Sequence, residues 1–288
     1  MSFQSNFLRF HDQILLQDAT HYAPVRQVRD QILSVFPNAS PGWQSLSTFI
    51  PHNWGSYAMG TGVRPLPGGD YDLDIGLVFN ASPSVDAWRL KNSIYTTLQA
   101  AGYRPTWMKP CISISLSGFH IDMSVCCRES ESRLFLAEGR QNAVVRWRPD
   151  GHEWFVRTIN AHHPNDPQQF KRVIRYLKRW KDIHFSADGM QGPVGLALTV
   201  MAYNWYSPQS DDLSALHTVV RLAMQHFRLG NASLPFPYEP RDNLLRKLSW
   251  DQVRQMQSRF EQLDRWLSQA AGYDGLVALQ RAFGSDFR

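Results

Sequence analysis

Three acidic side chains alternate along one short segment of the chain. Asp70, Asp72 and Asp74 stand two residues apart, and the apolar stretch that follows them ends at Phe79. A β-strand places residues i and i+2 on one face, about 7 Å apart. The segment holds no basic residue that would neutralise the carboxylates, so a divalent cation between them would explain the cluster. Ligand sets rich in oxygen favour Mg²⁺ or Mn²⁺ over Zn²⁺.

A glycine–serine pair stands ahead of the acids. Gly55 precedes Asp72 by 17 residues, and the pattern predicts that Gly55-Ser56 opens a helix. Glycine lets a phosphate approach the backbone, and helix N–H groups together with the serine hydroxyl can donate to it. A simple turn with a helix cap would leave the same two residues. The pair supports a phosphate-binding site only because the acids follow it.

A later segment carries a further acid among apolar neighbours. His120, Asp122 and Ser124 would share one face of a strand. Ile121 and Met123 flank Asp122 on the other face. If this strand lies beside the first one, Asp122 joins the predicted metal site.

The segment 170–180 repeats apolar residues at helical spacing. Three basic side chains border its apolar face, from where they could reach a cleft: Lys171, Arg175 and Lys178. Arg172 and Arg179 lie further round the helix, and we predict that they are solvated.

Two kinds of module must hold these residues. We predict an N-terminal helical region over 1–37, interrupted at Pro24, an α/β domain over 38–165, and a helical domain over 166–288. In the α/β domain we expect strands near 48–51, 71–79, 111–116, 119–127, 144–148 and 154–157, with a hairpin turn at Ser117-Gly118 and a helix over 84–101 capped by Ser84. In the helical domain we expect helices near 195–206, 214–227 and 250–271. The fold class is therefore α+β.

Composition excludes several other classes of protein. The 288 residues are 43% hydrophobic, which excludes a disordered chain, and three cysteines make no disulfide framework. The cysteine usage and the lack of a signal-peptide pattern favour the cytoplasm, and no apolar run is long enough to span a membrane. Lys and Arg total 30 against 25 Asp and Glu, a net charge of +5 that suits phosphate-bearing partners.

Three strings in this order resemble the cGAS/DncV-like nucleotidyltransferases. They are GSYAMGTGVRPLPGGDYDLDIGLVF (55–79), FHIDMSV (119–125) and VIRYLKRWKD (173–182). This family comprises the bacterial CD-NTases of CBASS anti-phage systems, within the polymerase-β-like superfamily. The ending RAFGSDF (281–287) also resembles the last residues of many bacterial members. The resemblance implies a polymerase-β-like palm of mixed sheet and helices, followed by a helical domain and braced by the N-terminal helix.

The resemblance also implies roles for individual residues. The catalytic, metal-binding residues would be Asp72, Asp74 and Asp122, holding two Mg²⁺ or Mn²⁺ ions. The nucleotide-binding residues would be Gly55, Ser56, Lys178 and Lys181. Asp70 lies outside the usual pair, as an auxiliary or merely solvated acid. A serine that the family often uses to contact nucleotide is replaced here by the run Gly192–Gly195. Tyr203, Trp205 and Tyr206 are candidates for stacking on a base, with core packing as the alternative.

The activity implied is condensation of NTPs into a cyclic di- or trinucleotide second messenger for anti-phage defence. The substrates would be ATP together with GTP or a pyrimidine NTP, and pyrophosphate would be released. Two alternatives stay open: a template-independent transferase that extends RNA or oligonucleotides, and an inactive nucleotide-binding regulator. The intact acids argue against the regulator, and the lack of a long basic arm argues against RNA extension. We expect no sequence-specific DNA binding and no membrane partner, but a regulatory partner could engage the C-terminal tail at Phe287-Arg288.

Overall fold

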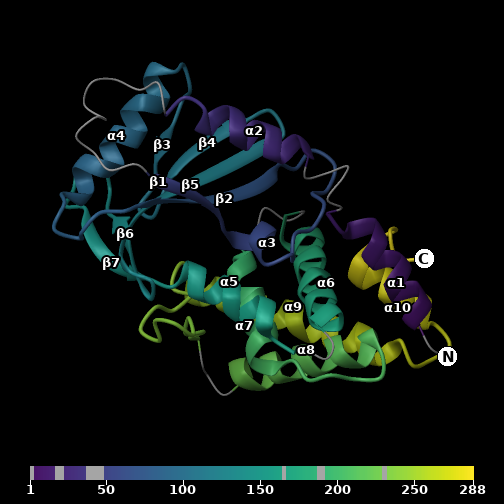
Figure 1. Cartoon of the computed structure of the whole chain (residues 1–288). Coiled ribbons are helices and arrows are strands. Elements are labelled where there is room, and N and C mark those ends of the chain that lie inside the picture. The colour runs from purple at the N-terminus through teal and green to yellow at the C-terminus, as the bar shows by residue number, and fades with distance from the viewer. Residues whose placement is uncertain (1–2, 17–22, 37–48, 164–166, 187–191, 229–231) are drawn as a thin grey trace. The chain divides into compact units, whose positions relative to one another are not determined.

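The computed structural model describes residues 3–16, 23–36, 49–163, 167–186, 192–228 and 232–288 (Figure 1). These residues divide between two compact units. The sheet unit comprises 16–59 and 64–156, and the helical unit comprises 1–15, 60–63 and 157–288. The predicted domain boundaries after residues 37 and 165, and the turn predicted at 38–42, lie outside the described residues.

A mixed sheet dominates the sheet unit. Its strands in the described residues are β1 (Phe49–Asn53), β2 (Tyr71–Phe79), β3 (Thr106–Trp107), β4 (Ile112–Leu116), β5 (Phe119–Ser130), β6 (Arg133–Glu138) and β7 (Arg146–Asp150). The order is β1-β2-β5-β4-β3, with β6 beside β5 and β7 beside β6. Only the β2–β5 pair among them is parallel. The expected α+β class is confirmed.

Chain order explains the one parallel pair. After β2, helix α4 (Ala87–Ala100) returns the chain to the end of the sheet at which β2 began. Strands β3, β4 and β5 then follow as antiparallel neighbours, and β5 pairs with β2 in parallel. The predicted hairpin joins β4 to β5. Gly118 has a φ of +79°, which a glycine adopts without strain, so the turn forms at the predicted residues.

One face of the sheet carries the core of this unit. The odd-numbered residues of β2 point to that face, and helices α2 (Ala23–Leu33) and α4 cover it (Figure 1). The buried β2 members are Leu73, Ile75, Leu77 and Phe79. Because successive side chains of a strand alternate between faces, the even-numbered acids are left on the opposite face.

Two local predictions in this unit are wrong. Asp86, not Ser84, caps α4, since its Oδ1 accepts from the backbone N–H of Trp88 at 2.9 Å. A capping side chain must directly precede the helix, and Ser84 is too early. The strand predicted over 154–157 belongs instead to helix α5 (His152–Ala161). Phe155 and Ile159, four residues apart, are its buried side chains, a helical spacing that the short window missed.

The helical unit surrounds one long helix. Its helices in the described residues are α1 (Gln4–Ile14), α6 (Pro167–Ser186), α7 (Gly195–Trp205), α8 (Asp212–Arg228), α9 (Trp250–Gln269) and α10 (Gly275–Phe283), close to the predicted segments. Helix α6 packs against α1, α7, α8 and α10. The apolar i, i+3, i+4, i+7 pattern predicted this: Phe170, Val173, Ile174 and Leu177 are all fully buried.

The N-terminal region contributes to both units. Helix α1 ends at Ile14 and belongs to the helical unit, whereas α2 begins at Ala23 and buries Val25 and Ile32 in the core of the sheet unit. Pro24 stands in the first turn of α2, where the missing N–H has no partner to lose. The helical pattern is interrupted, but the interruption begins after Ile14 and Pro24 itself lies inside α2, so the predicted position is wrong. The two helices contribute to different cores.

Candidate active site

The two strands that carry the acids are direct neighbours. The parallel register pairs Asp74 with Asp122 and Asp72 with His120. Paired residues on adjacent strands share a face, so the three predicted aspartates come together on the face opposite the core. Asp72 is exposed and Asp74 half-buried, and 32% of the Asp122 side chain is accessible. Asp70 lies just before β2 and is exposed, as a solvated acid would be.

The predicted phosphate-binding turn touches this cluster. The backbone N–H of Trp54 donates to the carbonyl oxygen of Asp74 at 2.9 Å. Gly55 follows with a φ of +57° and starts the short helix α3 (Gly55–Ala58), in which Ser56 comes second. A Cβ on Gly55 would overlap Oδ2 of Asp74. Glycine is therefore required here twice, by its backbone angle and by its closeness to the carboxylate.

Asp122 has an incompletely satisfied carboxylate. Its Oδ1 is buried and accepts no hydrogen bond from the described residues. The Nε2 atom of His120 lies 3.3 Å from that oxygen, within ion-pair distance, and 2.9 Å from the hydroxyl of Ser113. Burial, and then the charge of Asp122, raise the pKa of the neighbouring Cys111 thiol, so this thiol stays protonated.

The donor chemistry of the cluster suits a hard cation. All three predicted ligands are carboxylates, and one of their oxygens is buried without a hydrogen bond, as an oxygen reserved for a metal would be. As the side chains stand, no three His, Cys, Asp or Glu residues in the described ranges surround a single point closely enough to hold an ion. Binding would require the carboxylates to rotate toward the ion.

The same face of the sheet becomes apolar beyond the acids. Trp54, Val78 and Cys126 pack there with two leucines of β6, Leu134 and Leu136. Gly76 separates the two halves of the face along β2, and a Cβ at Gly76 would overlap the indole ring of Trp54. The apolar half thus forms a wall beside the carboxylates.

A histidine that the sequence did not suggest lies at this wall. His152 stacks on Trp54 with ring centroids 5.1 Å apart and planes 4° apart. Its Nδ1 is 2.5 Å from Oδ1 of Asp150. Burial alone would lower the pKa of His152, but the carboxylate of Asp150 outweighs it, and Asp74 adds to the net rise. The sole sequence signal was the spacing Asp150-x-His152, which is too common to single out.

The two predicted lysines lie in the helical unit, on α6. Lys178 donates from Nζ to both the carbonyl and the hydroxyl oxygen of Thr61, at 3.2 Å each. Lys181 forms an ion pair with the adjacent Asp182 at 3.0 Å. The structure therefore brings Gly55, Ser56 and the aspartates together in one unit and holds the lysines in the other.

The prediction that Arg172 and Arg179 are solvated is wrong. Arg172 forms a bidentate pair with Asp212, with donor–acceptor distances of 2.6 and 2.8 Å. Arg179 is only 2% exposed. A helical wheel cannot locate these side chains, because the acid that holds Arg172 stands 40 residues further along the chain.

The aromatic candidates for base stacking serve packing in large part. Tyr206 is 7% exposed and donates its hydroxyl to Oε1 of Gln169 at 2.9 Å, as a core tyrosine does. Tyr203 is half-buried against the ring of His162, and Trp205 lies against His226. Tyr203 and Trp205 are both half-buried, so they stay candidates for stacking.

The C-terminal tail is tied into the helical unit. Phe287 is fully buried in an aromatic cluster that it shares with Phe7, Phe10, Tyr176 and Phe283. The carbonyl oxygen of Arg288 accepts from the side-chain amide of Asn6 at 2.8 Å. A partner that engages this tail would therefore meet Arg288 first, and could reach Phe287 only by opening the cluster.

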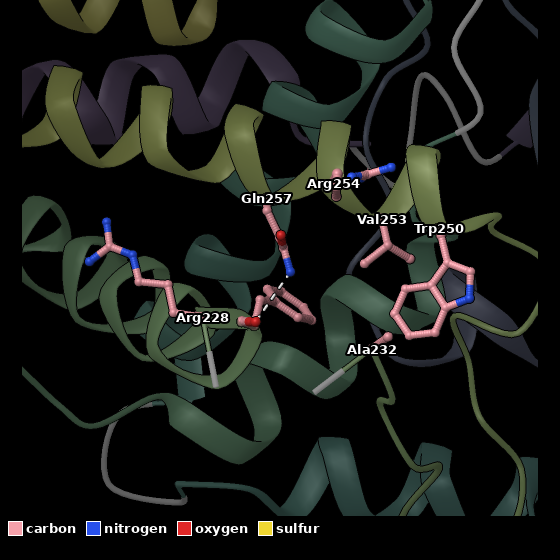
Figure 2. A pocket seen from close by; sticks show the side chains of 7 residues that line it. Arg228, Ala232, Trp250, Val253, Arg254 and Gln257 are labelled. Atoms are coloured by element: carbon pink, nitrogen blue, oxygen red, sulfur yellow. Dashed lines mark hydrogen bonds between the residues drawn. The ribbon is translucent and has the colours of Figure 1, made fainter. Parts of the chain in front are cut away.

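A cavity in the helical unit has different chemistry. Its lining, shown in Figure 2, consists of Phe227, Arg228, Ala232, Trp250, Val253, Arg254 and Gln257. Gln257 donates across it to the carbonyl of Phe227 at 3.2 Å, and Arg254 pairs with Asp251 at 2.6 Å. No carboxylate lines the cavity, so it offers no metal site of the kind found beside β2.

Comparison with known proteins gives a match over the acid-bearing segment. Residues 51–126 match a protein-family model described as "Cyclic GMP-AMP synthase DncV-like, nucleotidyltransferase domain". A c-di-GMP synthase of Roseivirga ehrenbergii is 21% identical over 220 residues, which is 66% of this chain. The match spans 58% of that relative's own length.

Solved structures match almost the whole chain. The CD-NTase CdnG of Bradyrhizobium diazoefficiens, in complex with GTP, has a TM-score of 0.77 at 14% identity and covers 97% of this chain and 95% of its own. CdnC of Escherichia coli MS115-1, in a CdnC:HORMA-deltaN complex, has a TM-score of 0.72 at 14% identity over 99% and 98% of the two chains. The Vibrio cholerae DncV cyclic AMP-GMP synthase gives 0.70 at 16% identity over 90% and 76%. At such identities the likeness shows a shared fold. Among the described helices, none is long and apolar enough to cross a membrane.

Proposed function

We propose that the chain is a DncV-like nucleotidyltransferase, because residues 51–126 match that family model and the chain has the fold of the bacterial CD-NTases. We propose further that it condenses NTPs into a cyclic oligonucleotide with release of pyrophosphate. The observation that carries the proposal is the pairing of Asp74 with Asp122 across β2 and β5, directly beside the glycine turn at Gly55. This arrangement sets carboxylates for metal ions next to backbone groups suited to phosphate.

In this proposal the aspartates hold the ions. Asp72 and Asp74 would bind both of two Mg²⁺ or Mn²⁺ ions, and Asp122 would complete the second. Such ions neutralise the charge of the triphosphate and favour ionisation of the attacking hydroxyl. The ribose hydroxyl oxygen of one nucleotide attacks the α-phosphorus of the other, the bond from that phosphorus to the β-phosphate bridging oxygen breaks, and pyrophosphate leaves.

The protein supplies position and charge rather than covalent chemistry. The N–H groups at the start of α3 and the hydroxyl of Ser56 would donate to the triphosphate of the donor nucleotide. Lys178 and Lys181 would add positive charge to the phosphates. Lys178→Ala should then raise KM for NTP more than Lys247→Ala, a substitution at an exposed lysine outside α6.

The names of the relatives suggest which substrates and product to propose. One relative is a c-di-GMP synthase, one structure contains GTP, and another is a cyclic AMP-GMP synthase. We propose ATP and GTP as first candidates, with a pyrimidine NTP as a further one, and a cyclic di- or trinucleotide as product. A second-messenger role in anti-phage defence, with a regulatory partner as in the HORMA complex of CdnC, is part of the same proposal.

A product assay tests the proposal. Purified protein is incubated with all four NTPs and Mg²⁺ or Mn²⁺, treated with phosphatase, and analysed by mass spectrometry. We expect a phosphatase-resistant mass equal to two or three nucleoside monophosphates less the waters of closure. Linear, phosphatase-sensitive products would instead identify a template-independent transferase. Absence of any product, with Asp72→Asn behaving identically and with nucleotide still bound, would favour an inactive regulator.

A further inference from the structure

A buried acid fixes one histidine at the wall of the candidate site. The side chain of Asp150 is 4% exposed, and its Oδ1 lies 2.5 Å from Nδ1 of His152. Its Oδ2 accepts from the backbone N–H of the same residue at 3.1 Å. Two contacts from a single carboxylate fix both the orientation of the His152 ring and the first residue of α5.

The held ring lies flat on a buried tryptophan. Trp54 is 2% exposed, and the planes of its indole and the His152 imidazole differ by 4°. The indole also lies against Gly76 of β2, where any side chain would collide with it. Trp54 is thus confined by the strand and by His152, and the nucleotidyl-transfer chemistry described above uses neither side chain.

Trp54 connects this packing to the acids. Its N–H donates to the carbonyl oxygen of Asp74 at 2.9 Å, and its own carbonyl accepts from Ala58 at 3.3 Å within the turn. The next residue, Gly55, lies against the Asp74 carboxylate. A rotation of Trp54 would therefore shift Gly55 and the N–H groups of α3 relative to that carboxylate.

We infer that His152, held by Asp150, is a positioning residue for nucleotidyl transfer, because its stack on Trp54 fixes the Gly55 turn that receives the donor triphosphate. The inference rests on the proposed function for its catalytic consequence. Its structural part, that His152 orders the turn, stands without substrate. Displacements of about 1 Å can lower a rate about 10²-fold, so an ordered turn has kinetic value.

The experiment compares two substitutions that differ in the aromatic face. His152→Ala removes the stack and the contact with Asp150, while His152→Phe keeps a flat ring on Trp54. His217→Ala serves as the control, because it removes a comparable pair, Nε2 of His217 to Oδ1 of Asp264 at 2.9 Å, in the helical unit. His152 is 41% exposed at its side chain, so both variants should fold.

Two measurements are made on each variant. Hydrogen exchange followed by mass spectrometry reports on the amides of 53–60 without nucleotide, and steady-state kinetics report KM and kcat with NTP. We expect His152→Ala to accelerate exchange in 53–60 at least about threefold and to raise KM for NTP about tenfold, with a smaller change in kcat. His152→Phe should restore most of both values, and His217→Ala should change neither.

The outcomes separate the inference from the proposed function. Unchanged exchange in His152→Ala would overturn the inference. Faster exchange in His152→Ala with an unaltered KM in an active enzyme would overturn the catalytic part of the inference. If His152→Phe restored neither the exchange rate nor KM, stacking on Trp54 would not be the cause. A wild-type protein that makes no product would contradict the proposed function, while the exchange data would still decide whether His152 orders the turn.

Discussion

Asp212 of the helical unit and Asp122 of the sheet unit differ in how fully their carboxylates are hydrogen-bonded. In the helical unit, Asp212 is fully buried and accepts from Nε and Nη2 of Arg172 at 2.6 and 2.8 Å, and from the hydroxyl of Tyr176 at 2.8 Å. Burial would raise the pKa of Asp212, but Arg172 and the hydrogen bonds outweigh it and lower the pKa. In the sheet unit, Asp122 keeps a buried oxygen without a hydrogen bond.

This contrast separates structural acids from available ones. A carboxylate whose lone pairs are used by its own chain stabilises the fold and has little left for a ligand. A carboxylate placed beside two others and left incompletely satisfied works against folding, since like charges repel. Its presence is better explained by something that binds there. Substitutions at Asp212 and at the acids of β2 and β5 test this division.

The largest effect is expected at the sheet acids. Asp74→Asn keeps the shape of the side chain but removes a charge that the proposed metal ions would need. Turnover of NTP should fall at least ~10³-fold. The melting temperature should stay equal or rise, because one repulsive charge is gone. Wild-type turnover in the double variant Asp72→Asn/Asp74→Asn would contradict the metal-site assignment.

The next effect is expected at the structural acid. Asp212→Asn leaves the half-buried Arg172 without its carboxylate, and breaking a pair whose acid is fully buried costs about 3 to 5 kcal/mol. Urea unfolding should show this loss. Asp264→Asn, which weakens a more exposed pair with His217, should cost about 1 kcal/mol or less. Equal losses of unfolding free energy in the two variants would contradict the assignment of Asp212 as a structural acid.

A smaller effect on rate is expected at the glycine turn. Gly55 and Gly68 both have positive φ, +57° and +82°, so alanine is strained at either position. Only at Gly55 would the new Cβ meet a neighbour, the carboxylate of Asp74. Gly55→Ala should therefore lower kcat about 10²-fold, while Gly68→Ala should leave kcat near wild type. If both variants lost activity alike, backbone strain and not the contact with Asp74 would be responsible.

The smallest effect is a pH dependence of the helical unit. Burial, and then the nearby charge of Arg175, lower the pKa of His11 to about 4. Because this folded-state pKa lies below the ordinary value of 6.5, the unfolded chain binds more protons between pH 6.5 and 4. Stability should therefore fall as the pH drops through that range. Thermal unfolding of His11→Gln should show a shallower decline than wild type, and identical declines would exclude His11 as a cause.

The three aspartates could be predicted as site residues from the sequence because they lie in regular strands. The alternating pattern predicted that Asp72 and Asp74 share one face of a strand, and the apolar neighbours of Asp122 predicted a second strand. That the second strand lies beside the first was only a condition of the metal-site hypothesis, and the structure supplies it. The roles of Arg172 and His152 could not be predicted from the sequence, for a physical reason. Their partners, Asp212 and Trp54, stand 40 and 98 residues away in the chain, and no local pattern reports such contacts.

Helix ends and short windows account for the other differences. The segment 154–157 contains two aromatic residues and a valine, which favour a strand when taken alone. The start of α5 depends on Asp150, whose carboxylate accepts from the N–H of His152. The start of such a helix depends on a contact with the end of the preceding strand, so the sequence of the helix alone does not predict it.

Pyrophosphate release in the presence of Mg²⁺ tests the central claim most directly, when wild type, Asp122→Asn and Asp212→Asn are assayed together and corrected for their folded fractions. We predict release by wild type, at least ~10³-fold slower release by Asp122→Asn, and a wild-type rate per folded molecule for Asp212→Asn. Equal release by Asp122→Asn and wild type would contradict the claim that the acids on β2 and β5 perform the chemistry.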